Sequence, residues 1–206
     1  LVMRLQNYMN EEIEVNDLIS ILKKDCKKFI KFVGLYNPPA LVYRSIKGSN
    51  DDYTTRTPRT NRKPTDTPLY VQEIMDELFY ERFGWKPRSG GVFTATGGFE
   101  GYGVPHVFFP IGDFKFVWSP EVRDLFIDLS RLHLLRHVKG KMSPEFYEET
   151  KKTLKPLIDS FYQNEKYNLA FNEEREIVWK CKKYHLVNIH YFDFHKETLI
   201  KELFNR

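Results

Sequence analysis

Helix-like and strand-like patterns follow one another along this chain without regular alternation. Apolar residues recur at three- and four-residue spacing between Asp17 and Val33, which predicts a helix that Gly34 ends. Segments rich in β-branched and aromatic residues, which predict strands, follow at 40–46, 91–94, 107–110, 114–118, 177–181 and 186–191. A doubly wound parallel sheet needs strands and helices in strict alternation, so this order predicts an α+β fold instead.

Serine–proline–glutamate sequences mark the start of two further helices. At 119–121 and again at 143–145, a capping hydroxyl precedes a proline at the first helical position and an early acidic side chain. These signals predict a pair of helices within 119–165. Another helix is expected over 68–84, and residues 111–113 (Ile-Gly-Asp) are predicted to form a hairpin turn between two strands.

One domain can accommodate all these elements. The chain has 206 residues, of which 41% are hydrophobic and 16% aromatic, which is enough to bury a substantial core. We expect a single domain, 1–206, with four consecutive parts: helices, a first strand and a basic loop at 17–84, strands at 88–118, inserted helices at 119–165 and C-terminal strands at 170–206.

Composition limits the classes of protein to which the chain can belong. Cys26 and Cys181 lack the spacing of a zinc site and the histidines form no metalloprotease motif, so no metal is expected. Two buried thiols suit a reducing compartment. No segment reaches the ~20 apolar residues of a membrane span, and no secretory leader is visible. We therefore expect a cytoplasmic protein with no membrane partner.

A polar and basic stretch separates the first strand from the next helix. Residues 47–68 contain almost no apolar side chains but include Arg56, Arg59, Arg62 and Lys63. A loop of this length in a compact domain is usually functional or disordered. The four cations could contact the phosphates of a nucleic acid, or they could simply be solvated. The net charge of +4 favours neither interpretation.

Three short motifs carry residues suited to ligand binding or catalysis. Arg44 lies in an otherwise apolar strand, where a guanidinium either pairs with a carboxylate or binds a phosphate through its planar fork. Paired glycines flank a short strand that carries the hydroxyls of Thr94 and Thr96, so the backbone there can approach a ligand closely. Glu174 and Glu176 enter a later strand two residues apart, which predicts that both point to the same side.

In this order the motifs resemble those of ADP-ribosyltransferases of the arginine–serine–glutamate class. Residues 43–44 (Tyr-Arg) resemble the first-strand arginine, 93–96 (Phe-Thr-Ala-Thr) the serine–threonine–serine motif, and 174–176 (Glu-Arg-Glu) the Glu-x-Glu motif. Ala95 stands in place of the middle threonine. The interval between the second and third motifs is long for the family, because it holds two predicted helices.

The resemblance implies a split, mostly antiparallel β-sandwich that binds NAD in a central cleft. Arg44 would hold the phosphates of NAD, and Glu176 would stabilise the positive charge that develops as nicotinamide departs. Thr94 would fix Glu176 through a hydrogen bond, while Glu174 would orient and help deprotonate the acceptor. The other contacts implied are with the cofactor, from Tyr43, Gly91, Phe93, Thr94 and Thr96, and with the substrate, from Tyr167 and Phe171 in the loop before the glutamates.

The Glu-x-Glu motif of this family implies a protein arginine as the acceptor. The chain would then be a mono-ADP-ribosyltransferase that uses NAD as a substrate and requires no metal. Two alternatives stay open. One is a protein that binds or modifies nucleic acid through 56–63. The other is a non-catalytic structural or interaction protein of a phage with the same fold, since 59–64 and 109–124 resemble tailed-phage proteins and a fold does not determine function.

Overall fold

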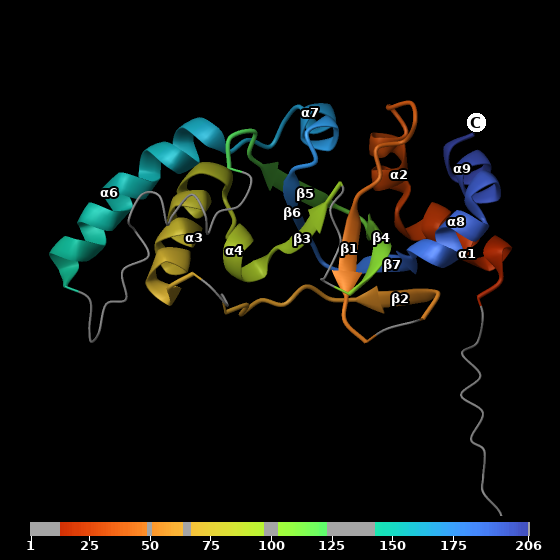
Figure 1. Cartoon of the computed structure of the whole chain (residues 1–206), viewed down its shortest axis with the longest axis horizontal. Coiled ribbons are helices and arrows are strands. Elements are labelled where there is room, and N and C mark those ends of the chain that lie inside the picture. Colours follow the sequence, from red (N-terminus) through yellow and green to blue (C-terminus); the bar gives the residue numbers. More distant parts are fainter. Residues whose placement is uncertain (1–12, 49–50, 64–66, 97–102, 123–142, 206) are drawn as a thin grey trace, which may run out of the picture.

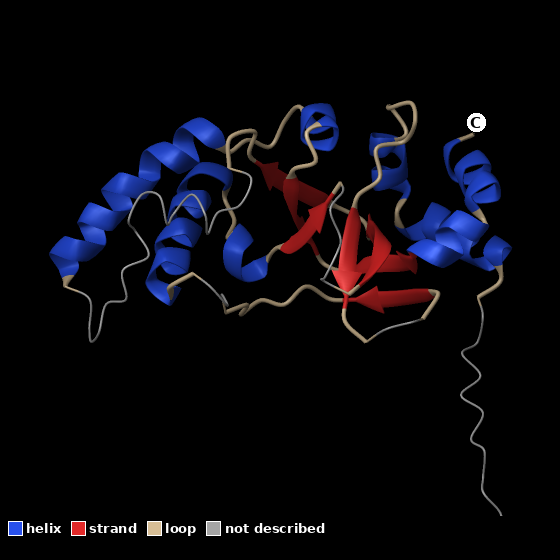
Figure 2. Cartoon of the chain, viewed as in Figure 1, coloured by secondary structure: helices blue, strands red, loops and turns tan. Residues whose placement is uncertain are grey.

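An antiparallel sheet lies at the centre of the computed structural model, with helices at both of its ends (Figures 1 and 2). The structure describes residues 13–48, 51–63, 67–96, 103–122 and 143–205. The seven strands are β1 (Tyr43–Ile46), β2 (Tyr53–Arg56), β3 (Val92–Ala95), β4 (Val104–Pro110), β5 (Phe114–Trp118), β6 (Glu176–Cys181) and β7 (Tyr184–Asn188). Their order across the sheet is β2-β7-β4-β1-β3-β6-β5. The predicted α+β class is therefore confirmed.

The sheet narrows to a single residue pair at its middle. Tyr43 on β1 lies opposite Ala95 on β3, and this is the one pair that joins these two strands. On either side the pairing is longer, with four pairs between β1 and β4 and four between β3 and β6. The sheet thus has two parts, β2-β7-β4-β1 and β3-β6-β5, that meet at a narrow junction.

Helices gather in two groups, one at each end of the sheet (Figure 1). The helices of one group come from both ends of the chain: α1 (Val15–Asp25), α2 (Lys27–Val33), α8 (Ile189–Phe194) and α9 (Lys196–Phe204). The other group consists of α3 (Leu69–Phe83), α4 (Pro87–Gly90) and α6 (Pro144–Phe161), with α3 packed along α6. The short α7 (Tyr167–Asn172) leads into β6. Among the described helices, none combines the length and the apolar character needed to cross a membrane.

Alternate residues of β6 enter two different hydrophobic cores. Ile177 and Trp179 are fully buried in the larger core, where the Trp179 ring lies 5.6 Å from the ring of Phe29 on α2. Val178 points the other way, into a smaller core with residues of α3 and α6 such as Phe79. The strand is therefore buried on both faces, as its continuous apolar run requires.

Two local expectations differ from the structure, one near the N terminus and one in the basic loop. The helix predicted from Asp17 to Val33 is two helices, because the backbone at buried Cys26 leaves the helical conformation (φ −112°, ψ 20°). The basic loop contains a strand, β2, which pairs along the edge of the sheet with β7. Its Tyr-Thr-Thr sequence at 53–55 has high strand propensity without apolar character, so a search for apolar runs misses it.

The predicted hairpin between β4 and β5 is not formed. Gly112 does make a turn with positive φ (69°) between them. However, β1 and β7 occupy both edges of β4, and β5 pairs with β6 at the far edge of the sheet. The turn therefore carries the chain from one part of the sheet to the other.

The C-terminal region is partly helical, with α8 and α9, although only strands were predicted over 170–206. β7 ends at Asn188, whose side chain accepts a hydrogen bond from the backbone N–H of His190 (2.9 Å) and so caps α8. The prediction of strand over 186–191 is wrong from residue 189 onward. The capping role of Asn188 is the local signal for this change.

Of the two helices expected within 119–165, the second is confirmed as α6. Ser143 caps it by accepting a hydrogen bond from the backbone N–H of Phe146 (3.2 Å). At the expected start of the first, Ser119 accepts from the backbone N–H groups of Glu121 (3.2 Å) and Val122 (2.9 Å). The rest of that predicted helix, 123–142, lies outside the described residues.

Candidate functional site

The three motifs that carry the sequence-based hypothesis lie on neighbouring strands. Arg44 is on β1, Thr94 is on β3 and Glu176 is the first residue of β6, and β1, β3 and β6 are consecutive in the sheet. The Arg44 guanidinium spans the narrow junction by donating a hydrogen bond from Nη1 to the carbonyl oxygen of Phe93 (2.8 Å). Chain segments far apart in sequence thus meet at the centre of the sheet.

A buried carboxylate positions the glycine-rich segment that leads into β3. Asp76 on α3 is 4% exposed, and its two oxygens accept hydrogen bonds from the backbone N–H groups of Arg88 (2.8 Å) and Ser89 (2.9 Å). These bonds anchor α4, and with it the Arg88 side chain. The Arg88 guanidinium lies over the Phe93 ring (5.0 Å to the centroid), and its Nη1 is 3.9 Å from a carboxylate oxygen of Glu176.

Arg62 covers the same aromatic ring from the basic segment that follows β2. Its Cζ atom lies 3.9 Å from the centroid of the Phe93 ring, which is within cation–π distance. Its backbone is held on both sides: its N–H donates to the carbonyl of Ser89 (3.1 Å), and its carbonyl accepts from the side-chain amide of Gln72 (2.6 Å). The guanidinium is therefore held in place before any ligand arrives.

Electrostatics at Arg62 indicate a local excess of positive charge. Although the residue as a whole is exposed, its guanidinium lies against Phe93, and this burial is the largest cause that lowers its pKa. The charges of Arg88, Arg44 and Arg59 lower the pKa further, whereas that of Glu176 raises it. Within the described part of the chain Arg62 forms no ion pair. An anionic ligand would relieve this repulsion.

The glycine before β3 is required by close packing and not by an unusual backbone conformation. Gly91 has ordinary extended backbone angles (φ −89°, ψ 158°), but a Cβ atom there would lie 2.3 Å from Cγ1 of Val178 and 2.5 Å from the carbonyl oxygen of Pro87. No direct contact with NAD is needed to explain this glycine.

We expect Gly91→Ala to lower the free energy of unfolding by about 1–3 kcal/mol, because the methyl group forces β6 and α4 apart. Chemical denaturation measures the loss. Gly90→Ala is the matched control, since a Cβ atom at Gly90 meets nothing within 4 Å and an alanine there should be neutral or slightly stabilising. Equal stability of the Gly91 variant and the wild type would contradict this packing.

The hydroxyl of Thr94 does not reach Glu176, contrary to expectation. It donates to the backbone carbonyl of Ile177 (3.0 Å) and accepts from the indole N–H of Trp179 (2.8 Å), and Thr94 is only 3% exposed. Glu176 lies directly opposite Ala95, so the side chains of Thr94 and Glu176 are on opposite faces of the sheet. Thr94 therefore does not hold Glu176 in this structure; its hydroxyl instead joins β3 to β6 inside the core.

We expect Thr94→Val to cost about 1–3 kcal/mol of stability, because the indole N–H of Trp179 loses its acceptor in a buried environment. Thr94→Ser keeps the hydroxyl and should restore most of the loss. Thermal unfolding of both variants measures the difference. Should valine be as stable as threonine, the bond to Trp179 would contribute nothing.

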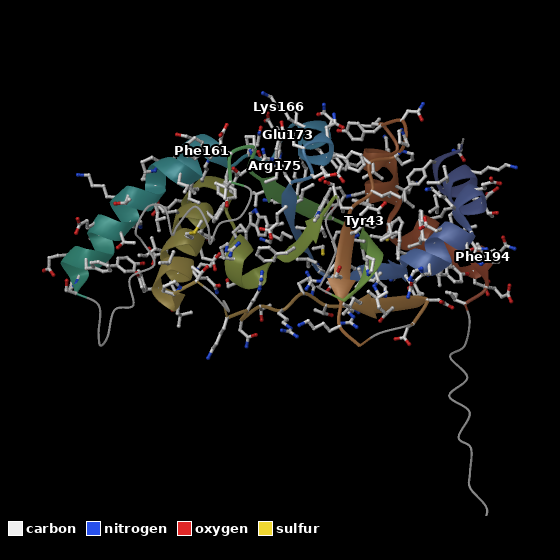
Figure 3. The ribbon with its side chains drawn as sticks, viewed as in Figure 1. Tyr43, Phe161, Lys166, Glu173, Arg175 and Phe194 are labelled. Carbon is white, nitrogen blue, oxygen red and sulfur yellow. The ribbon has the colours of Figure 1, made fainter. Side chains whose placement is uncertain are left out.

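The Glu-x-Glu motif has a different backbone from the one expected. Glu174 has a positive φ (53°) and lies in a turn before β6, so the alternation of side chains along a strand does not extend to it. Glu173, not Glu174, pairs with Arg175 (Nη2 to Oε2, 3.1 Å). Figure 3 shows Glu173 and Arg175 near α7 and Lys166. Strand alternation therefore does not predict that the side chains of Glu174 and Glu176 point to the same face of the sheet.

The two aromatic residues predicted to contact a substrate belong to the core. Tyr167 is 1% exposed, and its hydroxyl donates to the carbonyl of Ala40 (2.6 Å). Burial raises its pKa well above the usual value. Phe171 packs, half-buried, against the same core, and both residues lie in helix α7 where a loop was expected. Tyr167 has no surface for a substrate.

Residues beside the junction are also more enclosed than the resemblance implies. Tyr43 is half-buried on β1, and burial, with a smaller effect of the Asp193 charge, raises its pKa. The Thr96 hydroxyl is buried and has no hydrogen-bond partner among the described residues. Among the described aromatic residues that were predicted to contact a ligand, only Phe93 has two guanidinium groups over its ring.

The other basic residues predicted to contact phosphate lie at the end of β2 and in the segment that follows it. Arg56 ends that strand, Arg59 is exposed and close enough to affect Arg62, and Lys63 is exposed beside α3. Arg88 was not predicted from the sequence to be a binding residue. Its position beside Pro87 at the start of the glycine-rich segment was the available signal.

A second cluster of polar side chains connects β2 to α1, at the end of the sheet away from α3 and α6. His185 is 3% exposed, and its Nε2 lies 3.1 Å from a carboxylate oxygen of Asp25. Its Nδ1 meets the hydroxyls of Tyr53 (2.7 Å) and Thr55 (2.9 Å). Burial lowers the pKa of His185 more than Asp25 raises it, so the imidazole is neutral near pH 7 and holds the edge strand in place.

Neither cysteine is suited to nucleophilic chemistry, and both are free. Burial raises the pKa of Cys181 to about 12 and that of Cys26 still further, so both stay protonated. Over the described residues, no group of three or more His, Cys, Asp or Glu side chains is placed to hold a metal ion.

Comparison of the chain with models of known protein families, with curated proteins and with solved structures found no match in any of the three.

Proposed function

We propose that this protein is a mono-ADP-ribosyltransferase that cleaves NAD beside Glu176. The resemblance of the three motifs and one structural observation support this function. The guanidinium groups of Arg62 and Arg88 lie over the Phe93 ring, that of Arg44 donates to the Phe93 backbone carbonyl, and a carboxylate oxygen of Glu176 lies 3.9 Å from Arg88.

The arginines supply what a dinucleotide diphosphate needs. Guanidinium groups donate paired hydrogen bonds to phosphate oxygens, and a charged donor contributes more than a neutral one. Arg62 and Arg88 are held by backbone contacts and by the Phe93 ring, so little of their freedom remains to be lost on binding. Repulsion among them would fall when the diphosphate binds.

Glu176 supplies the complementary charge for bond cleavage. As the bond between C1′ of the ribose and nicotinamide breaks, the electron pair leaves with nicotinamide and positive charge develops on the ribose. A carboxylate placed beforehand next to that charge lowers the energy of the transition state. Glu176 is half-exposed, with 48% of its side chain accessible, so a substrate can reach it.

The direct test is incubation of the purified protein with NAD and measurement of released nicotinamide. We expect release that depends on enzyme concentration, together with a rise in unfolding temperature on addition of NAD. A protein that neither releases nicotinamide nor is stabilised by millimolar NAD would instead be a non-catalytic member of the fold.

A further inference from the structure

A groove with a largely apolar surface, bordered by lysine and hydroxyl side chains, lies beside the candidate site. It forms where segment 57–60 passes α4 and the end of β6. Its polar and aromatic lining includes Thr57, Thr60, Tyr80, Lys86, Lys180 and Lys182. No acidic side chain is among the described residues that line it, and its three lysines are exposed.

The groove continues onto a pair of lysines that face each other. Lys180 on β6 lies directly opposite Lys115 on β5, and both are exposed. Like charges in this position destabilise a sheet. Within the described residues, neither Lys115 nor any of the three lysines of the groove forms an ion pair. Two carboxylates are close enough to act on these lysines electrostatically, but Asp113 is paired with Lys28 and Glu77 with Lys151. The surface is therefore suited to an extended anion.

The mixture of cations, hydroxyls and an exposed ring favours one class of anion. Tyr80 is 58% exposed at the edge of the groove, where its ring is available for stacking. A single-stranded nucleic acid offers both a row of phosphates and unpaired bases, and stacking of a base on an aromatic ring contributes about 1–3 kcal/mol. Arg56 and Arg59 flank the lining residues Thr57 and Pro58 in the sequence, which adds positive charge near the groove.

We infer that this groove binds single-stranded nucleic acid, and that this nucleic acid is the acceptor of ADP-ribose. Lys180 and Glu176 lie on one face of β6 about 13 Å apart, and Val178 between them is buried against α4. A nucleic-acid strand held by Lys180 therefore has to pass over α4 to reach the reacting ribose. A base nitrogen or oxygen attacks C1′, nicotinamide leaves with the electron pair, and the proton passes to solvent.

Binding is tested without NAD, by fluorescence anisotropy of a labelled single-stranded oligonucleotide over a series of salt concentrations. We expect wild-type affinity to fall steeply with salt. The variant Lys86→Gln, Lys180→Gln, Lys182→Gln should bind more weakly, with a salt slope smaller by about 2, since each phosphate contact to a single strand contributes about 0.7. The matched control, Lys24→Gln, Lys27→Gln, Lys31→Gln, removes the same charge from exposed positions on α1 and α2.

Three results would overturn the binding site: no wild-type binding at low salt, equal affinity of the two triple variants, or tighter binding of a duplex than of a single strand. The acceptor assignment rests on the proposed function and has its own readout, the attachment of label from NAD to oligonucleotide or to protein. Label on protein alone would overturn it. Nicotinamide release without added acceptor should be equal in both triple variants, so failure of NAD cleavage can be told apart from failure of the groove.

Discussion

Replacing Glu176 by glutamine should reduce the rate of nicotinamide release about 10²–10³-fold without unfolding the protein. The amide retains the size of the carboxylate but lacks the negative charge that opposes the positive charge on the ribose. Glu176 is half-exposed at the start of its strand, so the substitution disturbs little packing. Nicotinamide release under saturating NAD measures the effect on the chemical step.

Glu173→Gln is the matched control for this prediction. Glu173 is an exposed glutamate three residues earlier that pairs with Arg175. Its substitution removes the same charge from the same region and should leave the rate within a few-fold of the wild type. Wild-type turnover by the Glu176 variant, with an unchanged unfolding temperature, would remove this residue from the mechanism and with it the proposed function.

The second large effect is expected at Arg62. Substitution by glutamine should raise the dissociation constant for NAD about tenfold to a hundredfold, because a charge-assisted hydrogen bond contributes about 1.5–3 kcal/mol. The effect exceeds that of an ordinary surface arginine because the backbone of Arg62 and the Phe93 ring hold the guanidinium in position. Isothermal titration calorimetry of the folded variant gives the affinity directly.

Arg82 offers a control of the same chemistry at another place. Its guanidinium also lies over an aromatic ring, that of Phe83 at 4.8 Å, but the pair lies at the end of α3. Arg82→Gln should leave the affinity for NAD unchanged. If both variants bind NAD as the wild type does, the phosphates lie elsewhere and the arginines around Phe93 serve another anion.

The sequence predicts the candidate site better at the level of strands than at the level of contacts. It places Arg44 and Thr94 on strands and Glu176 directly before a third, and these strands turn out to be neighbours. It does not predict the pairing register that sets Ala95 opposite Glu176. A shift of one residue would bring Thr94 to the face of Glu176, since a one-residue slip exchanges the faces of a strand.

Local chemistry determined several boundaries of the helices and strands. Caps, prolines and periodic apolar residues fix the start of α6 at Ser143, the end of α3 at Gly84 and the strand character of β6, because each signal acts within a few residues. Only the tertiary structure decided that β4 and β5 separate, that Tyr167 is a core residue and that Arg62 and Arg88 share one ring. Those outcomes depend on which distant segments bury each other, and no local pattern contains that information.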